Sequence, residues 1–271
     1  MSSLKRILIS VLRRLARAVL AKYRPDVVGV TGSVGKTSAT GAIAAVLGST
    51  YSVGRPPKNY NNELGLPLAV LGVASGGRSP LAWLRVITRG VGLLILRAPY
   101  PKILVLELGA DHPGDIAALV ELVAPRVGVV TTVGPAHLEF FETQDAVARE
   151  KAALVARLPG HGIAVLNADD RLVAEMRRRT HARVITYGFA PNADVRASDL
   201  AYLGPAAGEG VGVGMRCTVS AGQETATLQL PKVLGRHLVT TVLSALAVGV
   251  AYDLTLAEAA ASLAAWEPLP G

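Results

Sequence analysis

The stretch VVGVTGSVGKTS, residues 27–38, constrains the fold of this chain more than any other. A run of β-branched residues leads into two glycines, a lysine and a hydroxyl residue, and the next dozen residues have the composition of a helix. A strand, a glycine turn and a helix in this order form a phosphate-binding loop, in which backbone N–H groups and the helix N-terminus face an anion. The common pattern G-x-x-x-x-G-K-[ST] lacks its first glycine here, because Val30 stands at that position.

The loop residues predict a site for a nucleoside triphosphate with Mg²⁺. Lys36 is expected to reach the terminal phosphates, and Thr37 to offer its hydroxyl to the metal. Five further residues are expected to contact the nucleotide, namely Gly32, Ser33, Val34, Gly35 and Ser38. A glycine turn with a chance lysine is the plain alternative, and the strand–loop–helix context disfavours it.

The rest of the chain alternates between strand and helix patterns. Three continuous apolar runs are typical of buried strands and lie at 102–110, 126–133 and 162–169. Helical stretches are predicted at 80–98, 113–123 and 143–158. This rhythm predicts a doubly wound, mostly parallel α/β sheet of the phosphate-loop NTPase type. Beyond Thr186, alternating patterns predict a small antiparallel β extension, followed by two more helices.

The positive charge of the chain is concentrated at one end. Residues 1–24 hold seven of the 28 basic residues and none of the 20 acidic ones. The remaining 25–271 are nearly neutral, so we expect one large domain there and no nucleic-acid partner. The single cysteine, Cys217, excludes an intramolecular disulfide and favours a reducing, cytoplasmic setting.

Residues 4–23 predict a basic amphipathic helix, because apolar residues recur at spacings of three and four. Arginines interrupt the apolar run, which argues against a transmembrane span. Two interpretations follow. The helix packs on its own domain with a solvated basic face, or it makes weak contact with a membrane surface or docks a partner.

Polar residues follow the predicted strands, where open parallel sheets bind their ligands. Glu107 ends the run ILVLE and is placed to hold a metal beside the loop, with a cap of the strand end as the plain alternative. His137 follows the next strand, with a metal or phosphate role as one hypothesis and a structural role as the other. Asn167 opens the segment LNADD, which is either a nucleotide contact or a turn rich in Asn and Asp.

Seven segments in one order resemble the central domain of the Mur ligases, across roughly residues 26–271. They are TGSVGKTS, KNYNNELGLPL, LELGADHPGDI, GPAHLE, REKAAL, AVLNADD and LPKVLGRH. Mur ligases are ATP-dependent, ADP-forming ligases that build the peptide stem of peptidoglycan. The second and third segments resemble the members that add D-alanyl-D-alanine to a UDP-MurNAc-tripeptide.

The resemblance implies a reaction and roles for individual residues. A substrate carboxylate attacks ATP to form an acyl phosphate, and an amine then displaces phosphate to give an amide. Catalytic roles are implied for Lys36, His137 and Lys151, the last as a carbamylated lysine. Metal ligation is implied for Thr37, Glu107, His137 and Lys151. The resemblance further implies a substrate-facing loop at Asn59, Asn61 and Asn62, and nucleotide contacts by Asn167 and His237.

The chain departs from the family in three places. Members carry a UDP-binding domain before the loop and a closing domain after the central one, and we expect residues 1–271 to include neither. Leu238 and Thr241 stand where members have asparagines near the adenine. We therefore expect a fragment or a split ligase whose closing domain comes from a separate chain. A non-catalytic nucleotide-binding remnant, or another ligase of the superfamily such as a folylpolyglutamate synthase, is the alternative.

Overall fold

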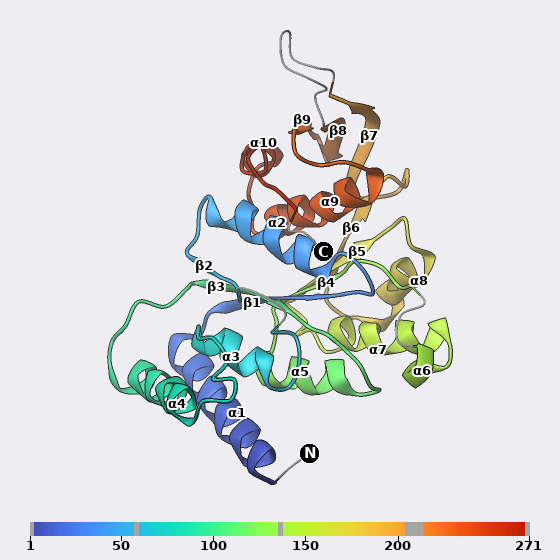
Figure 1. Ribbon diagram of the computed structural model, residues 1–271. Coiled ribbons are helices and arrows are strands. Elements are labelled where there is room, and N and C mark those ends of the chain that lie inside the picture. Colours follow the sequence, from blue (N-terminus) through green and yellow to red (C-terminus); the bar gives the residue numbers. More distant parts are fainter. Residues whose placement is uncertain (1–2, 57–59, 135–137, 204–213, 269–271) are drawn as a thin grey trace.

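The computed structural model describes residues 3–56, 60–134, 138–203 and 214–268. Its described strands form one sheet with the order β2-β3-β1-β4-β5-β6-β7-β8-β9 (Figure 1). Neighbours from β2 to β6 are all parallel. These strands are β1 (Asp26–Thr31), β2 (Val53–Gly54), β3 (Ile103–Glu107), β4 (Val127–Val130), β5 (Ile163–Asn167) and β6 (Arg183–Gly188). The predicted doubly wound α/β sheet is confirmed.

The far end of the sheet is antiparallel. It consists of β7 (Val195–Tyr202), β8 (Met215–Ala221) and β9 (Glu224–Leu230). The last two strands form a hairpin in which Ala221 pairs with Glu224 across a two-residue turn. Strand β7 still pairs in parallel with β6, through Tyr187–Val195 and Gly188–Arg196, so the parallel part continues past the point predicted at Thr186.

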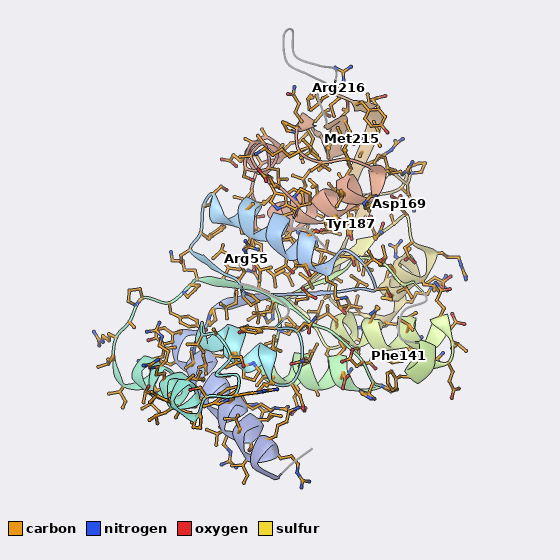
Figure 2. All side chains as sticks on the ribbon, in the orientation of Figure 1. Arg55, Phe141, Asp169, Tyr187, Met215 and Arg216 are labelled. Atoms are coloured by element: carbon orange, nitrogen blue, oxygen red, sulfur yellow. The ribbon has the colours of Figure 1, made fainter. Side chains whose placement is uncertain are left out.

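Helices cover both faces of the sheet (Figure 1). One face carries α2 (Lys36–Gly48), α9 (Arg236–Ala251) and α10 (Leu256–Ala261). The other carries α1 (Ser3–Tyr23), α3 (Gly65–Leu71), α4 (Pro80–Ile95), α5 (Asp115–Val123) and α7 (Gln144–Ala156). Shorter pieces are α6 (Leu138–Phe141), α8 (Arg171–Ala174) and the 3₁₀ helix Glu175–Arg179. Side chains fill both interlayer spaces, and Tyr187 is among the largest fully buried ones (Figure 2).

Strand β1 lies at the centre of the parallel part, between β3 and β4. Its residue Val30 is level with Glu107 on one side and with Val129 on the other. Because parallel strands end at the same edge, the loop after β1 meets the residues that follow β3, β4 and β5. This register positions the site described below.

Helix α1 packs on its own domain. Leu12, Ala16 and Val19 are fully buried, against a cluster that includes residues of α3 and α4. Ile7 remains 61% exposed, and the exposed Arg17 pairs with Glu121 at 3.4 Å. The apolar stripe that the sequence reveals is therefore directed largely into the protein, as the first of the two interpretations predicts. None of the described helices combines the length and apolar character that a membrane span requires.

Lys22 fastens α1 to the end of α4. Its Nζ donates to the carbonyls of Leu93, Leu94 and Leu96 at 2.7, 3.0 and 2.7 Å, and the hydroxyl of Tyr23 donates to Leu93 at 2.9 Å. The last carbonyls of a helix have no partner within the helix, and a cation also interacts favourably with this end of the helix dipole. The two helices thus form one unit.

A Lys22→Met variant tests this unit. We expect the free energy of unfolding to fall by about 1–2 kcal/mol, because three carbonyls lose a charged donor while water replaces it only in part. Urea denaturation followed by circular dichroism measures the change. Lys102→Met, which removes another exposed lysine, should leave stability within about 0.5 kcal/mol of the wild type. Equal stability of the two variants would contradict the capping role.

Candidate functional site

The glycine turn between β1 and α2 has the backbone of an anion-binding loop. Gly32 has φ +152° and Gly35, directly before α2, has φ +83°. No side chain caps the start of α2, and its first turn contains no acidic residue. The N–H groups of this helix end are therefore available to an anionic ligand. The Val34 carbonyl accepts from Thr131 Oγ1 at 2.7 Å, which ties the loop to the end of β4.

Glu107 is buried beside the loop, where the sequence places it. Thr37 Oγ1 donates to Glu107 Oε2 at 2.9 Å, and Asn61 Nδ2 donates to Glu107 Oε1 at 3.0 Å. The carboxylate is only 5% exposed, so these two donors hold it in one orientation. Three expected site residues from separate segments are thus brought into direct contact.

A hydroxyl and a carboxylate at this separation fit Mg²⁺. This ion prefers oxygen ligands, keeps several waters, and is commonly bound through one or two carboxylates together with the phosphates of the substrate. Within the described residues, no group of three or more His, Cys, Asp or Glu gathers as a complete protein cage. Thr37 and Glu107, which hydrogen-bond to each other, are two described residues that could hold the metal together with the substrate.

Lys36 stands between two cavities. The residue lines both, and its Nζ donates to the Gly32 carbonyl at 2.8 Å. Burial lowers the pKa of Lys36, while the carboxylates of Glu107 and Asp111 act in the opposite direction. The ammonium group is thus fixed by the loop carbonyl, at a residue that the two cavities share.

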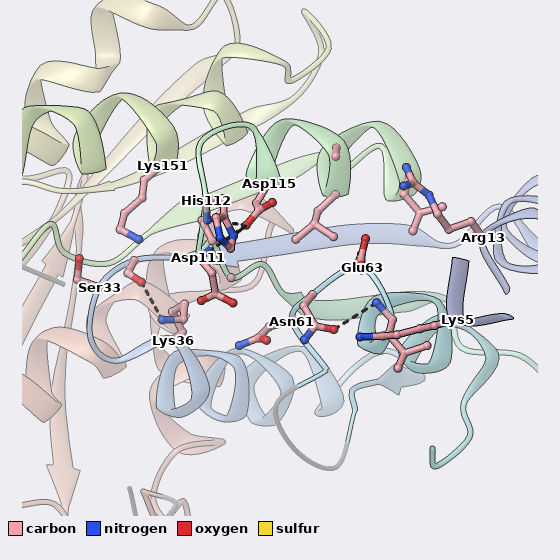
Figure 3. A pocket seen from close by; sticks show the side chains of 18 residues that line it. Lys5, Arg13, Ser33, Lys36, Asn61, Glu63, Asp111, His112, Asp115 and Lys151 are labelled. Carbon is pink, nitrogen blue, oxygen red and sulfur yellow. Dashed lines mark hydrogen bonds and ion pairs between the residues drawn. The ribbon is translucent and has the colours of Figure 1, made fainter. Parts of the chain in front are cut away.

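The first cavity has a volume of about 470 Å³ (Figure 3). Lys36 and Lys151 enter it from opposite sides, and Asn61 and Asn62 belong to its wall. Lys151, on α7, is only 4% exposed. Its pKa is lowered to about 8, chiefly because burial penalises the charged form and secondly because Lys36 is a nearby cation. A substantial fraction of this amine is therefore uncharged just above neutral pH.

The second cavity, of about 1420 Å³, lies on the other side of the loop. Its lining includes loop residues 34–38 together with Asn167, His237, Leu238 and Thr241. Asn167 is 2% exposed, donates to the Thr131 carbonyl at 2.8 Å and accepts from the Asp169 N–H at 3.0 Å. It therefore organises the turn as well as lining the cavity, so the two interpretations of this residue are compatible.

The remaining expected residues are placed less completely. Asn62 Oδ1 accepts from the N–H groups of Leu64 and Gly65, at 3.2 and 2.9 Å, and so helps to begin α3. The Ser33 hydroxyl accepts from Gly134 N–H at 2.9 Å. Asn59 and His137 lie outside the described residues, so their predicted roles stay predictions.

Sequence reasoning did not single out part of the first cavity wall. Asp111, His112 and Asp115 line it, directly after β3. Asp115 Oδ2 accepts from the backbone N–H groups of Asp111 and His112, at 3.0 and 2.8 Å. Their position in the sequence could have identified these three residues, because polar residues that follow a central parallel strand lie at the ligand-binding edge of the sheet.

The parallel sheet and the glycine loop at its edge define an α/β domain of the phosphate-loop NTPase type. The Mur ligase middle domain family matches residues 89–249, and the chain belongs to this family. The resemblance read from the seven sequence segments is thereby confirmed.

Named relatives agree with this assignment. A Mycobacterium bovis protein, UDP-N-acetylmuramoyl-tripeptide–D-alanyl-D-alanine ligase, is 37% identical over 264 residues, which are 96% of this chain and 46% of that protein. The Escherichia coli protein of the same name is 29% identical over 260 residues. The match spans 95% of this chain and 50% of that protein. The structure of the Thermotoga maritima MurF ligase in complex with ADP is similar, with 29% sequence identity and a TM-score of 0.76. The match covers 97% of this chain and 53% of the Thermotoga chain. The chain thus spans about half the length of the relatives it matches.

Proposed function

We propose that the chain is the phosphoryl-transfer core of an ATP-dependent, ADP-forming ligase that adds D-alanyl-D-alanine to a UDP-MurNAc-tripeptide in the cytoplasm. The observation that carries the proposal is the position of Lys36, which lines both cavities at the phosphate loop. A nucleotide in the second cavity would direct its terminal phosphate toward a carboxylate in the first. The names of the relatives support the choice of substrates.

The proposed reaction has two steps. A carboxylate oxygen of the peptide attacks the γ-phosphorus, a new O–P bond forms, the bond to the β–γ bridging oxygen breaks, and ADP leaves. The amine of D-alanyl-D-alanine then attacks the acyl carbon and loses a proton, and phosphate departs as the amide forms. Lys36 and the N–H groups at the start of α2 hold the transferring oxygens and offset their charge. Mg²⁺, held by Thr37 and Glu107, would supply further neutralisation of the phosphates.

Lys151 has a separate proposed task at the opposite wall of the first cavity. Its uncharged amine can add to CO₂ and lose a proton, which gives a carbamate with two oxygen atoms. Such a group is a suitable metal ligand, whereas an ammonium group is not. The lowered pKa supports this proposal, because only the uncharged amine is a nucleophile.

Lys36→Met tests nucleotide binding by the chain itself. We expect Mg-ATP affinity to fall by about 10- to 100-fold, because a charge-assisted contact to the phosphates is lost. Isothermal titration calorimetry measures the affinity. Lys102→Met serves as the matched control and should bind as the wild type does, since Lys102 is exposed at the opposite end of β3. Unchanged binding by Lys36→Met would show that the loop does not hold the phosphates.

Turnover requires a second experiment, because family catalysis depends on a closing domain. The chain is mixed with UDP-MurNAc-tripeptide, D-alanyl-D-alanine and Mg-ATP, with and without the C-terminal part of a longer relative added as a separate chain. ADP release with formation of the amide supports the proposal. Nucleotide binding with no turnover under either condition favours the non-catalytic module. If the chain instead turned over ATP with a folate and glutamate as substrates, it would be assigned to the folylpolyglutamate synthase type of ligase.

A further inference from the structure

Helix α4 is apolar on two opposite faces. One face packs into the domain through Val86, Gly90 and Leu93. The opposite face has four exposed apolar residues, namely Leu81 (59%), Leu84 (55%), Val91 (38%) and Ile95 (74%). Their spacing places them on one side of the helix, and Leu96, at 63% exposed, extends the stripe at its end. A surface helix ordinarily turns a polar face outward, so a contiguous exposed stripe marks an interaction site.

The two helices at this stripe carry charges of a single sign. Residues 64–106 contain five basic residues and no acidic one, and residues 1–25 contain seven basic residues and no acidic one. Helix α1 lies against α4 and is fastened to it by Lys22. The α1–α4 face consists of the exposed apolar residues of α4 and the exposed arginines Arg85, Arg89 and Arg97, and the basic helix α1 lies beside it.

We propose that the α1–α4 face docks on the surface of an anionic lipid bilayer. Guanidinium groups meet the lipid phosphates while neighbouring apolar side chains enter the boundary between headgroups and acyl chains, as in interfacial helices. A second copy of the chain is a poor occupant, because two such faces would bring like charges together. The helices lie on the bilayer and do not cross it, in keeping with the absence of a spanning helix among the described residues.

The structure changes which element makes this contact. The sequence suggests α1 alone, but the apolar residues Leu12, Ala16 and Val19 of that helix are buried. Helix α4 supplies the exposed apolar stripe, and α1 adds charge beside it. Helix α1 also contributes Lys5 and Arg13 to the lining of the first cavity.

Vesicle sedimentation with the full chain tests the proposal. We expect binding to vesicles of phosphatidylcholine mixed with phosphatidylglycerol, weaker binding at higher salt, and none to phosphatidylcholine alone. Arg85→Gln/Arg89→Gln should bind about 30-fold more weakly, since each basic residue near an anionic surface contributes roughly fivefold. Leu84→Gln/Ile95→Gln should lose about tenfold or more, because two apolar side chains no longer enter the bilayer.

Matched variants elsewhere separate this face from overall charge and hydrophobicity. Arg178→Gln/Arg179→Gln removes the same charge from the exposed 3₁₀ segment, and Tyr202→Thr removes an exposed apolar side chain from β7. Both should bind vesicles within about twofold of the wild type, after the general effect of net charge is screened by salt.

Two results would overturn the docking proposal. One is the absence of sedimentation with phosphatidylglycerol vesicles at low salt, or sedimentation that the face variants and the controls reduce equally. The other is a dimer, detected by light scattering, that dissociates in Leu84→Gln/Ile95→Gln, which would make the face an interface between copies.

Discussion

A Gly32→Ala variant is expected to lose about 3 kcal/mol of unfolding free energy and at least tenfold in Mg-ATP affinity. A Cβ at this position would lie 1.9 Å from Thr131 Oγ1 and 3.2 Å from the Thr132 nitrogen. The backbone of Gly32 also has φ +152°, a conformation that residues other than glycine rarely adopt. The loop would have to move away from β4, and its N–H groups would no longer converge on one phosphate position.

Two comparisons make this expectation specific. Gly48→Ala, where a new Cβ meets nothing within 4 Å, should be neutral or slightly stabilising, because alanine is the better helix former. Gly32→Ala/Thr131→Ala should recover part of the loss, since the atom at 1.9 Å is removed while the strained φ remains. Urea denaturation and calorimetry provide both quantities. A Gly32→Ala protein as stable as Gly48→Ala would contradict the close approach of the loop to β4.

The phosphate loop and Glu107 were predictable because their signals are local. A strand, a glycine turn and a helix within about 20 residues specify the loop wherever they occur. Glu107 then follows from one general rule, that parallel strands end at the same edge of the sheet. The 2.9 Å hydrogen bond between Thr37 and Glu107 shows that the loop and the end of β3 meet at this edge, and the metal-binding role of the two residues stays a prediction.

Elements that depend on tertiary contacts were not predicted. Strand β2 has two residues, and α3 has seven, all of them buried. Isolated pieces of this length are not stable in water, so their sequence carries little periodic signal. Strand β6 was hidden for another reason, because its last residues pair in parallel with β7 where alternating patterns suggest a hairpin.

Burial is the other property that periodicity leaves open. The apolar stripe of α1 is evident in the sequence, but whether it faces a domain or a membrane depends on α3 and α4. Lys151 is the sharper case, since the pattern AREKAAL is that of an ordinary surface helix. Helix α7 packs against α5 and β4, and Lys151 is only 4% exposed. Its proposed role came only through the family resemblance, and its environment is a product of packing.

Lys151→Met is expected to stabilise the fold at neutral pH while removing the amine required by the proposed chemistry. The folded-state pKa of about 8 lies below the ordinary value of 10.5, so between these values the unfolded chain binds more protons than the folded one. The wild type therefore gains stability as pH rises through this window and carries the full penalty below pH 8. Methionine has nearly the same shape and no charge, so the variant should be more stable by on the order of 2 kcal/mol at pH 7.

The pH profile distinguishes this cause from a simple packing effect. In CO₂-free buffer, the stability difference between Lys151→Met and the wild type should be largest below pH 8 and should shrink toward pH 10.5, whereas a packing gain would be constant. Lys102→Met, at an exposed position, should show no such dependence. With ¹³C-labelled bicarbonate, the wild type should show a carbamate resonance that the Lys151→Met variant lacks. Equal stability of variant and wild type at pH 7 would contradict a buried amine, and a carbamate signal that survives the substitution would assign the modification to another lysine.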